Sequence, residues 1–361
     1  MSALIPYMEY FLGANTAEGF RSYFSESYEP SEGWRVWIIK GGPGTGKSTA
    51  MRLVAEEAER RGIYHERCRC SSDPDSLDAV IIPEMRRAVY DGTAPHIMEP
   101  RVVGSCERIV NFGDAWDCGV LEERRKEIME LSAACARHHA AAQRWLRAAA
   151  AFREDTYTLA SSACDMRKLE RCAARIAASV VADGGKGRGK ADVRLLTAVT
   201  PKGVNGVFIP SEQVMERFAE RLVIFDRVGA ASAILLGMLA ERLRERGCDI
   251  TMCPCSQSGR PEHVIVTAFG LVVSVSNDMH AFSGNRRAVH CERFMDESKL
   301  TAESKRLASN RRGVREMTEL ASEEMQAAKS LHDRLERHYA AAVDFSRTSE
   351  YARRLVREMF N

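Results

Sequence analysis

One stretch, residues 41–49, constrains this chain more than any other, because it joins a predicted strand to a predicted helix through a glycine-rich loop. The apolar run at residues 36–39 precedes it, and apolar residues at helical spacing follow it between Met51 and Ala58. Its sequence, GGPGTGKST, contains the pattern G-x-x-x-x-G-K-[ST], which is typical of the phosphate-binding P-loop, or Walker A motif. We therefore expect a fold that binds a phosphorylated ligand here.

Each part of this loop has an expected role. The glycines let backbone N–H groups point at phosphate oxygens, and the start of the following helix adds a partial positive charge. Lys47 is expected to contact the β- and γ-phosphates, and the Ser48 hydroxyl to ligate Mg²⁺. The expected ligand contacts are Gly42, Pro43, Gly44, Thr45, Gly46, Lys47, Ser48 and Thr49.

Bulk composition narrows the class of protein. The 52 Lys and Arg residues nearly balance the 50 Asp and Glu residues, which offers no whole-protein attraction to nucleic acid or membranes. The most apolar stretches are shorter than the ~20 residues that cross a bilayer. The 11 cysteines show no secreted disulfide framework, and the N-terminus does not resemble a signal peptide. We expect a soluble, cytoplasmic protein.

The chain also repeats itself. In one register without gaps, Ile39 falls on Ile224, Gly44 on Gly229, and the Cys-x-Cys pair at Cys68 on the pair at Cys253. A register that holds over so many positions predicts two copies of one fold.

The second copy lacks the residues that would hold a triphosphate. Ser232 stands at the position of Lys47 and Ala233 at that of Ser48, while Val228 would crowd the phosphate site. We interpret this copy as a degenerate domain, or pseudo-domain, with a structural or regulatory role.

Acidic residues near predicted strand ends are candidates for the chemistry. Asp91 ends a short apolar stretch, which is where a Walker B motif has the carboxylate that holds magnesium. In the second copy, the residue aligned with Asp91 is Ser276. A polar loop at residues 71–78 carries Asp73, Asp75 and Asp78, which either lie near Mg²⁺, water or a second substrate, or form a solvated turn.

The catalytic base is left open. No Glu follows Asp91, so Asp73, Asp75, His96 and Asp114 are all candidates. His96 could equally be a hydrogen-bonded loop residue.

Helical patterns follow each copy. We expect a P-loop domain over residues 1–117, a helical arm over 118–182 broken near residues 153–155, a flexible Gly-rich linker over 183–192, the degenerate domain over 193–297, and a second arm over 298–361. Near the N-terminus we expect a short strand over residues 8–16 and a helix or turn over 16–28. The apolar stripes of the arms pack inside the protein or bind a protein partner.

Several segments together resemble a bacterial family of tandem P-loop ATPase-like proteins. They are residues 13–20, the P-loop, residues 70–78, 80–83, 91–96, 111–117 and 200–203. The resemblance implies ATP or nucleotide binding. In that family the second half can carry its own P-loop, whereas here it does not.

These observations predict an α/β protein with a duplicated P-loop NTPase fold, a mainly parallel sheet in each copy, and long helical arms. The favoured function is a Mg²⁺-dependent ATPase that acts as a conformational driver or switch, with Lys47, Asp91, Asp73 and His96 as candidate catalytic residues and Ser48 and Asp91 as Mg²⁺ ligands. ATP is preferred to GTP because no Asn-Lys-x-Asp stretch occurs. The alternatives are a small-molecule or nucleoside kinase, and a nucleotide-sensing scaffold with little turnover.

Overall fold

The computed structural model describes residues 7–181, 187–206, 220–277 and 287–361. The chain divides into two compact units. Unit 1 comprises Met1–Gln143, Val199–Gly203 and Ala321–Asn361, and unit 2 comprises Arg144–Ala198 and Val204–Leu320. Each unit is therefore assembled from segments that are distant in sequence.

The centre of unit 1 is a six-stranded sheet with the order β1-β5-β6-β7-β4-β8. Every strand but β6 runs in the same direction, because only the β5–β6 and β6–β7 pairs are antiparallel. The strands are β1 (Tyr7–Phe11), β4 (Arg35–Lys40), β5 (His65–Arg69), β6 (Leu77–Ile82), β7 (Arg87–Asp91) and β8 (Glu107–Asn111). The α/β class and the mainly parallel sheet expected from the sequence are confirmed.

Unit 2 contains a six-stranded sheet whose order, read from the other edge, follows the same path of the chain: β9-β13-β14-β15-β12-β16. Again one strand, β14, runs against the rest. The strands are β9 (Ala191–Val193), β12 (Glu220–Phe225), β13 (Ile250–Pro254), β14 (Pro261–Val266), β15 (Leu271–Ser276) and β16 (Arg287–His290).

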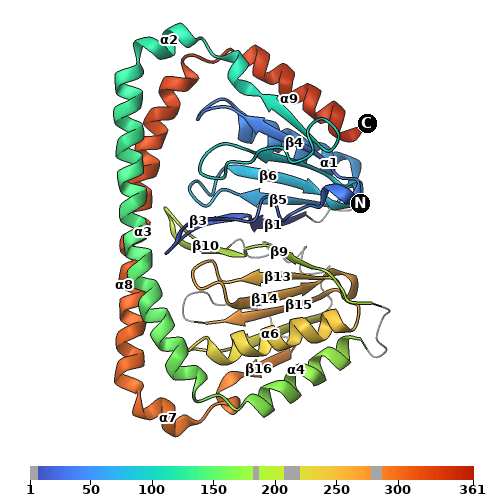
Figure 1. Cartoon of the computed structure of the whole chain (residues 1–361), viewed down its shortest axis with the longest axis vertical. Coiled ribbons are helices and arrows are strands. Elements are labelled where there is room, and N and C mark those ends of the chain that lie inside the picture. The colour runs from blue at the N-terminus through green and yellow to red at the C-terminus, as the bar shows by residue number, and fades with distance from the viewer. Residues whose placement is uncertain (1–6, 182–186, 207–219, 278–286) are drawn as a thin grey trace. The chain divides into compact units, whose positions relative to one another are not determined.

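One helix covers each sheet directly after the glycine-containing loop. In unit 1 it is α1 (Lys47–Arg61), and α9 (Phe345–Phe360) packs beside it, so that Leu355 and Met359 join the same apolar core as Met51 and Val54 (Figure 1). Burial of these side chains supplies most of the driving force for that packing.

In unit 2 the covering helix is α6 (Ala230–Glu245), and its neighbour is α4 (Met166–Val180), whose Leu169 and Ile176 share a core with Leu235 and Leu239. The two units thus exchange the last helices of their arms, α4 and α9. The helix that follows the first sheet packs in unit 2, and the helix that follows the second sheet packs in unit 1.

The other α-helices in the described part of the chain form the arms. They are α2 (Cys118–Glu123) and α3 (Arg125–Ser161) in the first arm, and α7 (Glu297–Ala302) and α8 (Ser304–Ala340) in the second. The helix break expected near residues 153–155 is wrong, because α3 continues to Ser161 and α4 begins only after Asp165. The carboxylate of Asp165 accepts the Lys168 N–H as an N-cap, whereas Asp155 binds Arg306 instead of capping a helix.

Two further expectations need correction. Of the helix or turn expected over residues 16–28, the helix is wrong and turns occur at residues 17–18 and 24–26. Strand β3 (Gly19–Ser22) lies between them and pairs with β2 (Gly13–Thr16), and Gly19 has a φ of +125°. The predicted linker is shorter than expected, because Ala191 and Asp192 belong to β9 and pair with β13; its residues 183–186 lie outside the described part of the chain.

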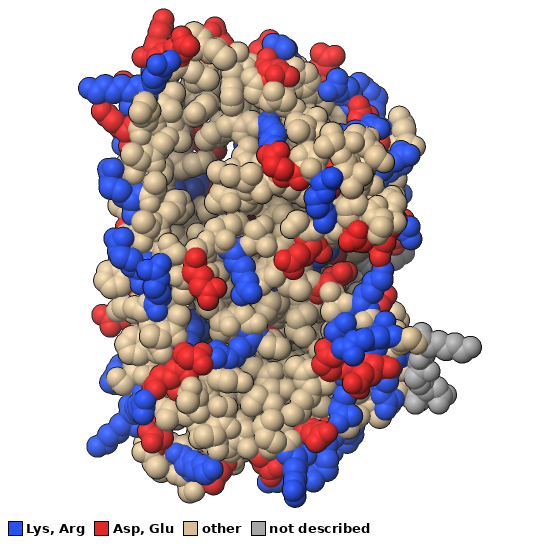
Figure 2. Space-filling view, in the orientation of Figure 1, with Lys and Arg blue, Asp and Glu red and all other residues tan. Residues whose placement is uncertain are grey.

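Charged side chains of both signs are interspersed on the face of the protein shown in Figure 2, in keeping with the balanced composition. Of the helices that the structure describes, none combines the length and the hydrophobicity that crossing a bilayer requires.

Candidate functional site

The loop between β4 and α1 has a backbone that only glycine adopts readily. Gly44 and Gly46 have φ values of +67° and +88°, in the left-handed region. The first N–H groups of a helix have no partner inside the helix. Within the described residues, the backbone N–H groups of Gly44, Gly46 and Lys47 have no acceptor. This set of N–H donors fits an oxyanion such as a phosphate group.

Lys47 lies at the centre of the site. Its Nζ donates to the carbonyl oxygens of Gly41 at 3.0 Å and Gly42 at 2.7 Å, and lies 3.6 Å from Asp91 Oδ2. The two charged side chains are only 10% and 13% exposed. They meet because β4 and β7 are parallel neighbours and Ile39 is paired with Asp91, so both strands end at the same edge of the sheet.

Two hydroxyl groups fix the geometry around this ion pair. The Leu77 N–H donates to Ser48 Oγ at 3.0 Å, which holds Ser48 in the first turn of α1. Asp91 Oδ1 accepts from the N–H of Thr93 at 3.0 Å and from its hydroxyl at 2.5 Å. The Ser48 hydroxyl and the Asp91 carboxylate are oxygen donors of the kind that Mg²⁺ prefers.

A buried histidine adjoins Asp91. Nε2 of His96 lies 3.3 Å from Asp78 Oδ1, and its ring stacks on Phe24 with centroids 4.8 Å apart. The ligand atoms of Asp78, Asp91 and His96 lie within 4.8 Å of one another. Burial lowers the pKa of His96, but the carboxylates of Asp78 and Asp91 raise it further, to about 9. At neutral pH the imidazole is protonated, which does not favour a general-base role for His96.

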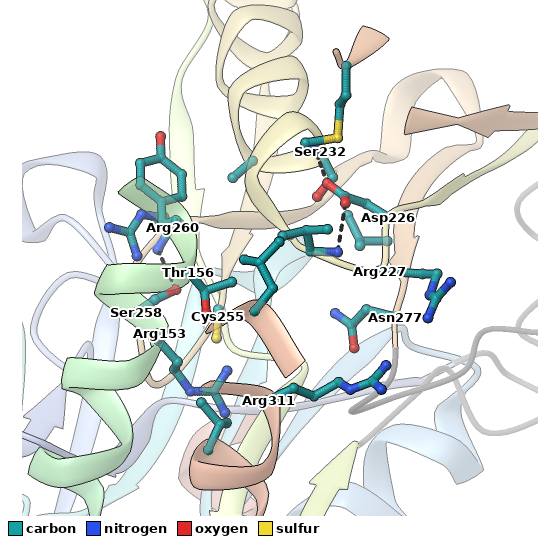
Figure 3. Close-up of a pocket in the computed structure, with 18 of the residues that line it drawn as sticks. Arg153, Thr156, Asp226, Arg227, Ser232, Cys255, Ser258, Arg260, Asn277 and Arg311 are labelled. Carbon is teal, nitrogen blue, oxygen red and sulfur yellow. Dashed lines mark hydrogen bonds between the residues drawn. The ribbon is translucent and has the colours of Figure 1, made fainter. Parts of the chain in front are cut away.

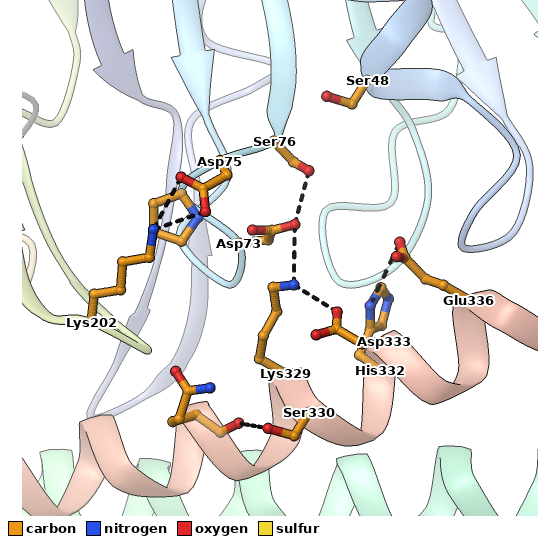
Figure 4. A network of polar contacts seen from close by, with 12 residues as sticks. Ser48, Asp73, Asp75, Ser76, Lys202, Lys329, Ser330, His332, Asp333 and Glu336 are labelled. Atoms are coloured by element: carbon orange, nitrogen blue, oxygen red, sulfur yellow. Dashed lines mark hydrogen bonds and ion pairs between the residues drawn. The ribbon is translucent and has the colours of Figure 1, made fainter.

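Asp73 belongs to a second network (Figure 4). Its Oδ2 accepts from Ser76 Oγ at 2.9 Å and lies 3.6 Å from Nζ of Lys329 on α8, which donates to Asp333 at 2.6 Å. The structure thus brings Lys47, Asp91, Asp78 and His96 together, whereas it places Asp73 beside Lys329 of α8.

The two other carboxylates proposed as bases lie at the surface. Asp75 pairs with Lys202 at 2.8 Å, and Asp114 is exposed and accepts from Asn111 Nδ2 at 2.6 Å. Neither contact involves Lys47 or Asp91.

The end of α8 covers the loop, which the sequence did not reveal. A Cβ atom on Gly44 would lie 2.8 Å from the Glu336 carbonyl oxygen, and one on Gly42 would lie 3.1 Å from the Tyr339 ring and 3.0 Å from the Trp116 ring. Ligand atoms of His332, Asp333 and Glu336 on the same helix lie within 4.8 Å of one another. The sequence signal was weak: charged residues at i,i+4 spacing indicate an ion pair on any exposed helix.

The equivalent loop of unit 2 satisfies its own N–H groups. The Asp226 carboxylate, 2% exposed, accepts the N–H of Val228 at 3.0 Å and that of Ser232 at 2.8 Å. The N-terminus of α6 therefore already has an anion bound to it, supplied by the chain itself.

The counterpart of Asp91 in unit 2 is Val275, which corrects the sequence alignment on Ser276. Ile39 pairs with Asp91 in unit 1, whereas Ile224 pairs with Val275 in unit 2. The shift arises because the connection between β13 and β14, residues 255–260, is one residue shorter than residues 70–76 between β5 and β6. Neither Val275 nor Ser276 offers a carboxylate to a metal.

In comparisons with protein-family models, curated proteins and solved structures, nothing was found to match this chain.

Proposed function

We propose that the protein is a Mg²⁺-dependent ATPase that binds ATP at the P-loop of unit 1 and uses binding and hydrolysis as a conformational driver or switch. The observation that carries the proposal is the 3.6 Å approach of Lys47, the first residue of α1, to Asp91, the last residue of β7. Beside this pair lies the loop in which the N–H groups of Gly44, Gly46 and Lys47 have no acceptor among the described residues. This is the arrangement that P-loop NTPases require of their Walker A and Walker B residues.

The residues would divide the work as follows. The loop N–H groups and Lys47 would bind the phosphates. Lys47 Nζ would then exchange its hydrogen bonds to the Gly41 and Gly42 carbonyl oxygens for bonds to phosphate oxygens. Ser48 and Asp91 would hold Mg²⁺, which neutralises charge on the phosphate oxygens when it is bound. Asp78, held by His96 beside Asp91, is positioned to orient water in the same region.

The packing of α8 supports the switch. The loop at Gly44 lies so close to α8 that a Cβ atom there would come within 2.8 Å of the Glu336 carbonyl oxygen, so a phosphate that moves the loop would alter its packing against this helix. The shared strand order of the two sheets supports the further proposal that the fold is a duplicated P-loop NTPase fold whose second copy is degenerate.

The test compares the native protein with Lys47→Ala and with Lys305→Ala, which removes an exposed lysine of α8 in unit 2. Affinity for MgATP is measured by calorimetry and turnover by phosphate release. Lys47→Ala should weaken binding by about 10-fold or more and reduce phosphate release to background, while Lys305→Ala should match the native protein.

Other outcomes would redirect the proposal. Tight binding without phosphate release would favour a nucleotide-sensing scaffold, and transfer only to an added acceptor would favour a kinase. Indifference to every nucleotide would contradict all three functions.

A further inference from the structure

Unit 2 contains a cavity of about 560 Å³ beside its own degenerate loop (Figure 3). Its wall is formed by the loop at residues 226–233, the connection between β13 and β14, the last part of α3 and the first part of α8. This volume lies within the range of small-molecule sites, about 300–1,000 Å³.

The loop end of this cavity is unsuited to a triphosphate. Asp226 occupies the N–H groups of Val228 and Ser232, and no lysine stands at the position of Ser232. A phosphate group here would meet the Asp226 carboxylate, and like charges at short range repel.

The opposite wall carries positive charge. Arg153 of α3 and Arg311 of α8 line the cavity on this side, and Figure 3 shows both side chains there, whereas Arg227 belongs to the loop itself and is exposed. Arg153 is half-buried, and its Nε is fully buried without an acceptor. In the described part of the chain no carboxylate pairs with Arg153, whereas its neighbour Arg260 is bonded to Glu154 at 2.5 Å. A partly buried guanidinium without a partner is costly, and a bound anion would remove that cost.

The equivalent wall in unit 1 has the opposite character. Helices α3 and α8 are both 37 residues long, and Arg153 occupies in α3 the same position, counted from the first residue, as His332 in α8. Beside the loop of unit 1, therefore, α8 presents His332, Asp333 and Glu336, a set suited to a cation. Unit 2 presents an arginine, which suits an anion that binds without a metal.

The remaining lining is mixed. It includes the buried Glu262, which accepts the Thr197 hydroxyl at 3.2 Å, and the exposed Glu292 and Glu297, and it also has an apolar part. Leu300, Leu307 and Val314 face the cavity from α7 and α8, so a ligand that fills it must bring an apolar body as well as its charge.

We propose that the cavity of unit 2 binds a small amphipathic anion, a carboxylate or phosphate monoester on an apolar body, whose charged group binds Arg153 and which needs no magnesium. The site is separate from the nucleotide site of unit 1 and does not depend on it. It makes unit 2 a ligand-binding unit in its own right.

The test uses octyl phosphate and octanoate as probes, with 1-octanol as the uncharged control, titrated calorimetrically into the full chain. The two charged probes separate a phosphate from a carboxylate preference. At least one should bind about 10-fold or more tightly than octanol, with the same affinity in EDTA and in the presence of MgATP. Equal affinities for all three, or loss of binding in EDTA, would overturn the proposal.

Two variants locate the site. Arg153→Gln should weaken binding of the preferred probe by about 10-fold, and Ala308→Phe, which fills part of the cavity without removing a charge, should weaken it by a similar factor. Arg171→Gln removes an exposed arginine of α4 outside the cavity and should leave the affinity unchanged. Unaltered binding in Arg153→Gln and Ala308→Phe, with native circular dichroism, would place the probe elsewhere and overturn the proposal.

Discussion

Residues 41–48 of unit 1 and residues 226–233 of unit 2 follow equivalent strands, and both loops use a glycine in the left-handed region, Gly44 with φ +67° and Gly229 with φ +82°. They differ in what their N–H groups bind. In unit 1 the N–H groups of Gly44, Gly46 and Lys47 have no acceptor in the part of the chain that the structure describes, whereas in unit 2 the Asp226 carboxylate accepts the N–H groups of Val228 and Ser232. The helix that follows also begins two positions earlier in unit 2, at Ala230 after Gly229, than in unit 1, where it begins at Lys47 after Gly46. In unit 2 the chain itself thus supplies the anion at the start of the helix.

The largest expected effect concerns the Asp91 carboxylate, which has no counterpart at Val275. In Asp91→Asn, phosphate release should fall by about 100-fold, because the group that would hold Mg²⁺ beside Lys47 loses its charge. Steady-state phosphate release at saturating MgATP measures this. Asp192→Asn alters an exposed carboxylate on β9 and should be without effect. Full activity in Asp91→Asn would show that the carboxylate present in unit 1 and absent at Val275 of unit 2 is not needed for phosphate release.

Gly44 and Gly229 provide a matched pair. Gly44→Ala should cost about 3 kcal/mol of stability, because the methyl group adds a backbone clash 2.8 Å from the Glu336 carbonyl oxygen to the strain of positive φ. Gly229→Ala, with nothing within 4 Å of the new Cβ, should cost about 1 kcal/mol from φ alone. Amide hydrogen-exchange rates in α1 and in α6 measure the stability of unit 1 and of unit 2 separately. Equal losses would show that the contact with α8 contributes nothing.

Removing the internal anion tests the other side of the comparison. Asp226→Ala should destabilise unit 2 by about 2 kcal/mol, because the partly buried N–H of Val228 and the buried N–H of Ser232 lose their acceptor. Faster hydrogen exchange at these two amides is the readout, with Asp192→Ala as the exposed control. Unchanged protection would mean that the carboxylate does not hold the loop.

The smallest effect distinguishes the units by pH. Burial and the nearby Arg67 lower the pKa of His65 from 6.5 to about 4, and Arg67 Nε donates to its Nε2 at 3.2 Å. Because the unfolded chain takes up the proton first, unit 1 should lose stability as the pH falls from about 6.5 towards 4.

The corresponding first residue of β13 is Ile250, which does not titrate. His65→Ile should therefore reduce the loss of stability of unit 1 between pH 7 and pH 5.5 by about 1 kcal/mol. Denaturant unfolding at the two pH values measures this. If His65→Ile loses as much unfolding free energy between the two pH values as the native protein does, other groups cause the acid sensitivity.

Local sequence predicted much of unit 1. The strand, loop and helix around Lys47 could be read directly, because their glycines and apolar spacing act over a few residues. Asp91 could be placed near Lys47, since parallel strands end at one edge of a sheet. The β2–β3 hairpin was missed because its turn depends on the single residue Gly19.

What lies over the loops could not be read from the sequence. Lys329, Asp333 and Arg153 belong to helices whose charges look alike whether they face solvent or a site. Their positions follow from which arm packs on which sheet, a choice made by contacts between segments far apart in the chain, such as Met359 with the core around Met51.

The exchange of terminal helices reverses the order in which the units can be completed during synthesis. Unit 2 already has α4 when α6 is made, and its last segment ends at Leu320. Unit 1, although its sheet is translated first, lacks α9 until residue 360 has been added. During synthesis, the surface of α1 that packs against α9 therefore stays uncovered until the later segments of unit 2 have been translated.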